Sequence, residues 1–361
     1  MSATFHSLRV AAIDELTDDA VALTFELPES LAPEFDFAPG QHLSIRGGAG
    51  ATDEVRRSYS LCTSPTSGVL RIGVKRLPGG AFSEGVVGRL RVGDRLDVMT
   101  PAGRFTAAID PAARRTHVAV AAGSGITPVL SIVTAILEGE PDSSVLLIYA
   151  NRTHRSVMFL DEVHDLKDAY PTRLQIVHVL SRERQDVDLL SGRLDGARLE
   201  RILAALMPPG PLGSSVDEWY LCGPQQMVGE LRATLDGLGV DARCVHSELF
   251  HADPVARVPV AALAGAPEGA ARVTVRLAGR ASDLDLRPDD VPVLEAALRV
   301  RSDLPFACKG GVCGTCRARV VEGTVAMDAN WALEPDEIER GYVLTCQSHP
   351  TSDRVVVDFD G

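Results

Sequence analysis

The chain has 361 residues, of which 45% are hydrophobic and 24% charged, and its formal net charge is −13 at pH 7. A chain of this length is too long to fold around one hydrophobic core, so we expect two or three domains. The composition is that of a soluble globular protein. The acidic balance argues against nucleic acid or an anionic membrane as a partner, and the segment MSATFHSLRV lacks the apolar core of a signal peptide, which favours a cytoplasmic location.

Residues 1–110 have the pattern of short strands separated by Pro and Gly turns. The segment AVALTFEL places Val21, Leu23, Phe25 and Leu27 at every second position, which is the period of a half-buried strand. Further strand-like segments are QHLSIRG, VRRSYSLC, VLRIGVKRL and DRLDVMT. Regularly spaced short strands predict a small antiparallel β-barrel.

Residues 111–250 alternate short apolar runs with helical patterns. The runs are HVAVAA, VLLIYA, RLQIVHVL and EWYLCG. Helical spacing groups two sets of apolar residues on single faces: Leu199, Ile202, Leu203 and Leu206, then Met227, Leu231, Leu235 and Leu238. The uncharged stretch 116–137 is interrupted by glycines and a proline, which favours strand, loop and helix over a membrane span. The alternation predicts an α/β domain with a doubly wound parallel sheet.

The segment 251–271 is rich in Ala, Pro and Gly and predicts an interdomain linker. Residues 272–361 follow as a small α+β domain. Its predicted elements are the strands RVTVRLAG and ASDLDLRP, the helix VPVLEAALRV, a cysteine-rich loop and a final strand RVVVDFD.

Four of the seven cysteines have the spacing C-x4-C-x2-C-x29-C: Cys308, Cys313, Cys316 and Cys346. This is the spacing of a plant-type [2Fe–2S] cluster, and Gly310, Gly311 and Gly314 allow the backbone to direct amide N–H groups at the sulfurs. A zinc loop is the alternative, although zinc sites normally show two C-x2-C pairs. A disulfide is disfavoured in a reducing compartment.

A flavin site is expected upstream, because such a cluster takes single electrons whereas a nicotinamide delivers a hydride, and a flavin converts one into the other. In RRSYSLC, Arg57 suits a phosphate and Tyr59, two residues on, suits a flat ring, with Ser60 on the other side of the strand. In VKRLPGGAFSEGV, Gly79, Gly80 and Ser83 precede a short apolar helical stretch, and backbone amides at a helix start suit a pyrophosphate. A solvated strand and a plain glycine turn are the alternatives.

A nicotinamide site is suggested by AAGSGITPVLSIV, where Gly123 and Gly125 permit close approach of a diphosphate. We expect Thr127 to be the N-cap and Pro128 the first residue of the following helix. Cys222 ends the last apolar run. The side chain of a cysteine at this position could lie near a nicotinamide ring, and burial in the core is the alternative.

Polar residues after two other runs suit a 2′-phosphate. Arg152 follows VLLIYA, and Ser181 and Arg182 follow RLQIVHVL. Each arginine could equally be a solvated surface charge.

These motifs resemble the ferredoxin–NADP reductase-like flavoproteins in kind and order: RSYS (57–60), GAFS (80–83), GSGITP (123–128), CGP (222–224) and ELF (248–250). With the C-terminal ferredoxin segment, the chain resembles self-contained oxygenase reductases. Three segments are similar to the reductase subunits of phenylacetyl-CoA epoxidases: LIYANRTHRSVMFLDEVHDLKDAYP, HVLSRERQDVDLLSGRLD and MDANWALEPDEIERGYVLTCQS.

The resemblance implies an FAD-binding barrel, an NAD(P)-binding domain and a β-grasp ferredoxin domain. It implies that Arg57 binds flavin phosphate, Tyr59 stacks on the isoalloxazine and Ser60 approaches its N5. The residues implied for the FAD pyrophosphate are Gly80, Ala81, Phe82 and Ser83. Those implied for the nicotinamide diphosphate are Gly123, Gly125, Thr127 and Pro128.

It further implies that Cys222 lies by the nicotinamide and that Glu248 and Phe250 close the flavin site from behind. The catalytic set is therefore Ser60, Cys222 and Glu248. Arg152, Ser181 and Arg182 resemble a 2′-phosphate site, which favours NADPH as the co-substrate.

The predicted function is electron transfer from NADPH through FAD and a [2Fe–2S] cluster to a separate oxygenase, with the di-iron phenylacetyl-CoA epoxidase as the favoured partner. The alternatives are the reductase of a Rieske-type oxygenase, such as a ketosteroid hydroxylase, and a non-enzymatic zinc-stapled binding protein. An acidic run before Cys346 is expected to help form the docking face, a solvated loop being the alternative: Glu334, Asp336, Glu337 and Glu339.

Overall fold

The computed structural model describes residues 4–47, 56–80, 82–84, 87–207, 210, 215–250, 269–287 and 291–361. The chain divides into two compact units, one of residues 6–55 and 59–250 and the other of residues 251–361 with the short segments 1–5 and 56–58. Nearly all of the predicted linker 251–271 lies outside the described residues. Within the described ranges, no helix is long and apolar enough to cross a membrane.

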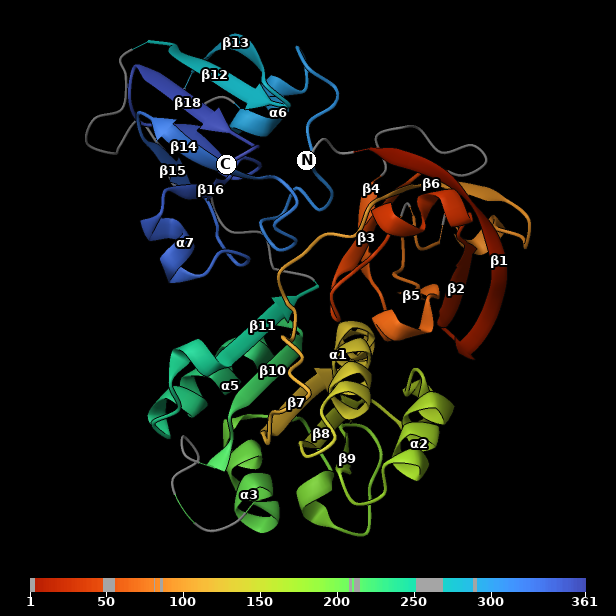
Figure 1. Cartoon of the computed structure of the whole chain (residues 1–361). Helices are drawn as coiled ribbons and strands as arrows, with labels where there is room; N and C mark the ends of the chain where they lie inside the picture. The colour runs from red at the N-terminus through yellow and green to blue at the C-terminus, as the bar shows by residue number, and fades with distance from the viewer. Residues whose placement is uncertain are drawn as a thin grey trace. The chain divides into compact units, whose positions relative to one another are not determined.

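Six antiparallel strands form the first sheet, in the order β4-β3-β6-β1-β2-β5 (Figure 1). They are β1 (Phe5–Thr17), β2 (Ala20–Glu26), β3 (His42–Arg46), β4 (Arg56–Ser60), β5 (Leu70–Lys75) and β6 (Arg95–Met99). A bridge between Leu61 and Ile72 joins the two edges of the sheet, so the strands curl into the expected barrel. The longest strand, β1, was not among the predicted segments.

Five parallel strands form the second sheet, in the order β11-β10-β7-β8-β9. They are β7 (Thr116–Ala122), β8 (Ser144–Asn151), β9 (Leu174–Leu180), β10 (Glu218–Gly223) and β11 (Val245–Leu249). Because β7 has β8 on one side and β10 on the other, the winding direction reverses at β7. Such a reversal leaves a crevice at the carboxyl ends of the strands, where ligands bind in open α/β sheets.

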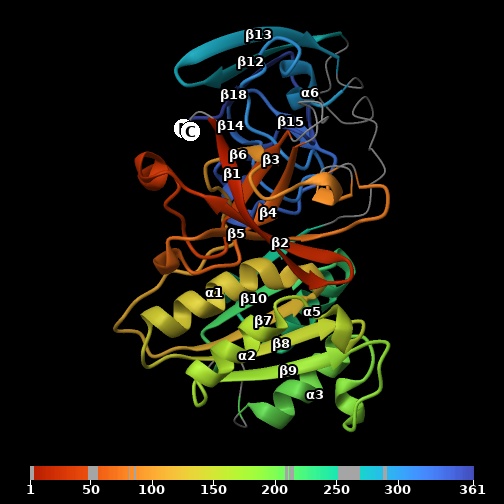
Figure 2. The same cartoon turned by 90° about the vertical axis from the view of Figure 1, so that its right-hand side faces the viewer.

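Helices cover both faces of this sheet (Figures 1 and 2): α1 (Ile126–Gly139), α2 (Leu160–Ala169), α3 (Gly196–Leu206) and α5 (Gln225–Gly237). On one face, α1 and Val163 of α2 share a buried cluster with Leu147 and Tyr149 of β8. On the other, α3 approaches α5 so closely that a Cβ on Gly196 would meet Thr234. Leu206, predicted on the buried face of its helix, is instead 36% exposed.

The C-terminal part is a five-stranded mixed sheet in the order β13-β12-β18-β14-β16, with a separate pair of strands, β15 and β17. The strands are β12 (Ala271–Leu277), β13 (Arg280–Leu286), β14 (Arg317–Glu322), β15 (Val325–Met327), β16 (Tyr342–Leu344), β17 (Ser348–Pro350) and β18 (Arg354–Asp358). Two short helices, α6 (Val293–Ala297) and α7 (Pro335–Glu339), complete it. The sequence predicts a helix over residues 291–300, and α6 is shorter than this apolar segment.

Candidate functional site

The carboxyl ends of β7 and β10 lie beside the winding reversal, and residues predicted for the nicotinamide site lie at both: Gly123, Gly125, Thr127 and Pro128 follow β7, and Cys222 lies near the end of β10. Gly123 has φ +54°, in the left-handed region that glycine tolerates best. A Cβ on Gly125 would lie 2.3 Å from the Cys222 carbonyl oxygen, so no side chain fits there. The loop after β7 is therefore packed directly against the backbone at the end of β10.

The helix after this loop begins earlier than predicted. Residues Gly123–Gly125 form a 3₁₀ turn, and α1 begins at Ile126 with Gly125 as its N-cap. Thr127 is therefore not the cap: its hydroxyl donates to the Ser124 carbonyl at 3.0 Å from within the first turn. Pro128 lies in that turn as well, where its missing N–H costs nothing.

Two buried acid–base groups meet where the barrel contacts the parallel sheet. The Ser60 hydroxyl of β4 donates to Glu248 Oε2 at 3.2 Å, and His42 Nδ1 of β3 lies 3.9 Å from Glu248 Oε1. The Glu248 side chain is only 11% exposed, and burial raises its pKa to about 8, although the Ser60 hydrogen bond lowers it. Glu248 is therefore a neutral carboxylic acid at pH 7. His42 is a residue that the sequence analysis missed, because no local motif marks it.

Cys222 pairs in register with Glu248 in the neighbouring strand. It is fully buried, and burial raises the pKa of its thiol well above the ordinary value. The group is therefore an inert thiol by itself, which suits a packing role beside a ligand better than nucleophilic chemistry. Phe250 follows β11 and is 37% exposed.

On β4, Tyr59 packs against Phe82 with ring centroids 5.4 Å apart and planes inclined by 38°. Phe82 is buried, so it supports the Tyr59 ring from one side. Arg57 is exposed, as strand alternation predicts, and donates to the Arg56 carbonyl at 2.7 Å.

The predicted pyrophosphate turn is stabilised from within. Ser83 Oγ accepts from the Leu77 amide at 3.1 Å, and Glu84 accepts from the Gly79 amide at 2.8 Å. A Cβ on Gly80 would lie 2.8 Å from the Leu77 carbonyl oxygen as well as 2.4 Å from Ser83 Oγ, so a side chain would clash with the backbone of this turn. Ala81 lies outside the described residues.

The ends of β8 and β9 bring the two predicted phosphate-binding arginines together. The Ser181 amide donates to the Asn151 carbonyl at 2.9 Å, and the Arg182 amide donates to the Arg152 carbonyl at 2.7 Å. Both arginine side chains are exposed. The neighbouring Glu183 carboxylate accepts from the His154 amide at 2.8 Å.

The four loop cysteines lie as two pairs. The thiols of Cys308 and Cys313 are hydrogen-bonded to each other, as are those of Cys316 and Cys346. The bond from Cys313 and the backbone amides of the loop lower the pKa of Cys308 to about 6 against the effect of burial. Two pairs of cysteines suit the two irons of a [2Fe–2S] cluster, each of which takes two cysteine sulfurs. Within the described residues, no three His, Cys, Asp or Glu side chains converge on one point as around a single ion.

The surroundings of the cysteines also fit a cluster. The Gly310 amide donates to Cys308 Sγ at 3.3 Å, and Gln347 Nε2 lies 3.5 Å from Cys346 Sγ. The Trp331 amide donates to the Gly311 carbonyl at 3.1 Å, which lays the segment before α7 over the loop. Its indole Nε1 is buried and has no partner among the described residues, as expected of a donor whose acceptor belongs to a bound group.

The acidic run before Cys346 differs from the predicted docking face. Glu337 points inward, fully buried, and its carboxylate pairs with Arg317 Nη1 at 2.7 Å. Glu334 is the N-cap of α7 and forms a capping box with Glu337, while Asp336 pairs with Arg340. One of the four carboxylates is thus a structural group, because the turn of α7 directs it to the interior.

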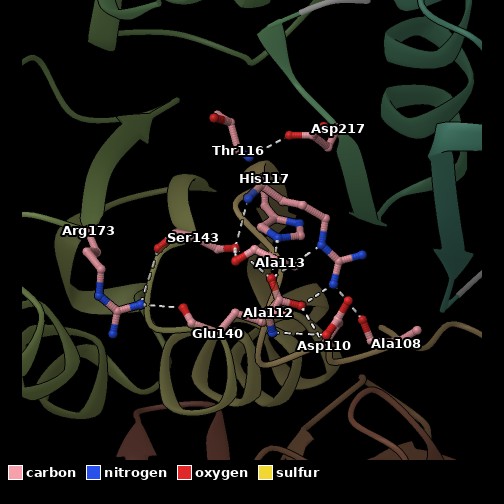
Figure 3. Close-up of polar contacts among 11 residues, drawn as sticks. Ala108, Asp110, Ala112, Ala113, Thr116, His117, Glu140, Ser143, Arg173 and Asp217 are labelled. Carbon is pink, nitrogen blue, oxygen red and sulfur yellow. Dashed lines mark hydrogen bonds and ion pairs between the residues drawn. The ribbon is translucent and has the colours of Figure 1, made fainter.

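A second buried polar cluster was not anticipated and lies at the amino end of the parallel sheet (Figure 3). The Glu140 carboxylate, fully buried, accepts from Arg115, from Ser143 Oγ at 2.7 Å and from the Asp110 amide at 3.2 Å. His117 Nε2 lies 3.3 Å from Glu140 Oε2. The cluster is at the opposite end of the sheet from the crevice, so it stabilises the fold rather than contributing to the ligand site.

Comparison with known families divides the chain into three matched parts. Residues 7–107 match the "Oxidoreductase FAD-binding domain", residues 119–232 the "Oxidoreductase NAD-binding domain" and residues 275–351 the "2Fe-2S iron-sulfur cluster binding domain".

Curated relatives match over nearly the whole length. The chain is 44% identical over 359 residues to one component protein of the 1,2-phenylacetyl-CoA epoxidase of Escherichia coli (strain K12), covering 99% of this chain and 98% of that protein. It is 34% identical over 357 residues to the ferredoxin reductase component of 3-ketosteroid-9-alpha-monooxygenase from Rhodococcus rhodochrous, covering 98% and 96%.

Solved structures share the fold at lower identity. Phthalate dioxygenase reductase matches with a TM-score of 0.59 at 23% identity, covering 98% of both chains. An intact type IV self-sufficient cytochrome P450 monooxygenase matches with a TM-score of 0.67 at 23% identity, covering 98% of this chain and 41% of that one.

Proposed function

The chain belongs to the ferredoxin–NADP reductase-like oxygenase reductases, which join FAD-, NAD- and [2Fe–2S]-binding domains in one polypeptide, and from this premise we propose that its electron acceptor is a di-iron oxygenase of the phenylacetyl-CoA epoxidase type. The single observation that carries the proposal is the 44% identity, over almost all of both chains, to the Escherichia coli epoxidase protein. The ketosteroid monooxygenase reductase, at 34%, supports the second candidate acceptor, a Rieske-type oxygenase.

Bound FAD accepts a hydride and releases single electrons, and the [2Fe–2S] cluster carries single electrons onward. Tyr59, backed by Phe82, offers a ring face for stacking, and Arg57 offers a phosphate ligand. The loop at 123–128 and the end of β10 offer backbone amides to a diphosphate.

The proposed role of Glu248 is to hold a proton at the flavin site. Its carboxyl group is neutral at pH 7 because of burial, and its partner Ser60 is the hydroxyl proposed to approach the flavin N5. Cys222 and Phe250 are proposed to complete the walls of the site.

The acceptor is tested by reconstitution. The purified chain, mixed with NADPH, phenylacetyl-CoA and an active di-iron epoxidase component, is expected to support epoxidation. The matched control replaces Cys346 with Ser, which should retain FAD but lose the cluster and the coupled reaction. The proposal is wrong if the wild-type chain reduces ferricyanide but does not support turnover of an active epoxidase. If the same protein supports a Rieske-type oxygenase, that oxygenase replaces the epoxidase as the assigned acceptor.

Coenzyme choice is proposed to rest on Arg152 and Arg182, whose backbones are hydrogen-bonded to each other. Changing both to Ala should raise KM for NADPH roughly tenfold and leave KM for NADH nearly unchanged, because exposed arginines contribute modestly to phosphate binding. Steady-state reduction of ferricyanide measures both constants. Arg184→Ala is the control, since Arg184 is exposed in the same loop and lies 3.9 Å from Asp188. A wild-type preference for NADH would contradict the NADPH assignment.

A further inference from the structure

His42 is held rigidly at the start of β3. Its amide donates to the Ala102 carbonyl at 2.8 Å, and its carbonyl accepts from the Ala102 amide at 2.9 Å. The residue is only 2% exposed, and Gly103 passes so close to the ring that a Cβ there would lie 2.8 Å from Nδ1. Backbone and neighbours therefore define where the imidazole points. Burial lowers its pKa to about 4, so the ring is neutral at pH 7.

The imidazole faces the oxygen of Glu248 that Ser60 does not use. Ser60 donates to Oε2, while His42 Nδ1 lies 3.9 Å from Oε1. This separation is longer than a hydrogen bond, and contacts of catalytic groups are often long before ligands bind. A neutral carboxylic acid has one O–H to donate, and a neutral imidazole has one ring nitrogen to accept it.

We propose that His42 is a positioning residue for Glu248, whose imidazole holds the carboxyl group in its proton-bearing form and in contact with Ser60. The inference rests on the proposed function, since it assigns a partner to the carboxyl group proposed to serve the flavin site. It adds a third residue, from β3, to Ser60 of β4 and Glu248 of β11.

A further ionisable group, Cys222, faces Glu248 but does not compete for this role. Cys222 lies opposite Glu248 in the adjacent strand β10, and burial raises the pKa of its thiol, which keeps it neutral. Burial thus raises the pKa of Glu248, the Ser60 hydrogen bond lowers it, and His42 is the side chain that lies beside the other carboxyl oxygen.

Infrared titration of the oxidised, FAD-loaded full-length protein tests the proposal. The C=O stretch of a protonated carboxyl group that disappears in Glu248→Gln assigns the Glu248 band, and in the wild type its midpoint is expected near pH 8. His42→Gln introduces an amide N–H that stabilises the carboxylate, so the midpoint should fall by about one unit. His42→Phe keeps a ring but removes the polar neighbour, so the midpoint should rise and the band should move to higher frequency.

His246→Gln is the matched control, because His246 lies on the same strand as Glu248 but pairs with Glu218 at 2.8 Å. It should leave the band unchanged. Opposite shifts in the two His42 variants support the proposal, since a purely structural role would not move the midpoint in opposite directions. If both variants retain the wild-type band and midpoint, or if only one folds and its band is unchanged, the proposal is wrong. Flavin absorbance and NADPH–ferricyanide turnover of the same samples test the proposed function separately.

Discussion

Among single residues, Glu140 carries the clearest stability prediction (Figure 3). Burial raises its pKa, but the hydrogen bonds from Arg115, Ser143 and the Asp110 amide outweigh burial and hold the pKa at about 2, below the ordinary 4.5. A lowered folded-state pKa stabilises the fold above the unfolded pKa, and this contribution is lost as the pH falls from about 4.5 to about 2. Glu140→Gln should cost about 3 kcal/mol at pH 7, because it leaves Arg115 without its buried anion.

Urea unfolding at several pH values measures this effect. The chain has two tryptophans, Trp219 in the parallel sheet and Trp331 in the ferredoxin domain, so a Trp331→Phe background makes fluorescence report on the sheet alone. The acid-induced loss of stability should be shallower in Glu140→Gln. Asp142→Asn is the control, since Asp142 forms an exposed pair with Arg114 that is worth little. An unchanged pH profile in Glu140→Gln would show that the cluster does not determine acid stability.

At the scale of elements, α7 is a five-residue helix that Glu337 joins to β14 through Arg317. Glu337→Gln should lower the temperature at which the visible absorbance of the cluster is lost, because removing one partner of this largely buried pair costs about 2 kcal/mol. Glu339→Gln, on the exposed side of the same helix, should have no effect on that temperature. Equal loss of the cluster in both variants would contradict the structural role of Glu337.

At the scale of the whole molecule, one compact unit ends at Phe250. A chain cut after Phe250 should keep FAD and reduce ferricyanide with NADPH at close to the full-length rate. It should reduce cytochrome c poorly and fail to support an oxygenase, because the one-electron carrier is gone. The measurements are flavin absorbance and the three turnover rates. A truncated chain that drives the oxygenase as well as the full-length protein would refute the proposed path through the cluster.

The sequence alone determined the fold classes, the cluster ligand pattern and the order of the motifs, because each depends on local information. A strand shows its period of two within eight residues, and a parallel α/β domain shows its alternation along the chain. The spacing of Cys308, Cys313 and Cys316 needs only one loop. A strand can be predicted from its own sequence only where apolar and polar residues alternate. The residues of β1 lack a clean alternation, so the sequence did not predict this strand.

Which side chains meet depends on how distant parts of the chain pack together. Ser60 and Glu248 are 188 residues apart, and His42, on a third strand, lies 3.9 Å from the same carboxyl group. The burial of Glu337 depended on the turn of α7, and the N-cap at Gly125 on close packing against β10. Such contacts arise when distant strands pack together and exclude water, and that exclusion of water keeps Glu248 protonated and His42 neutral.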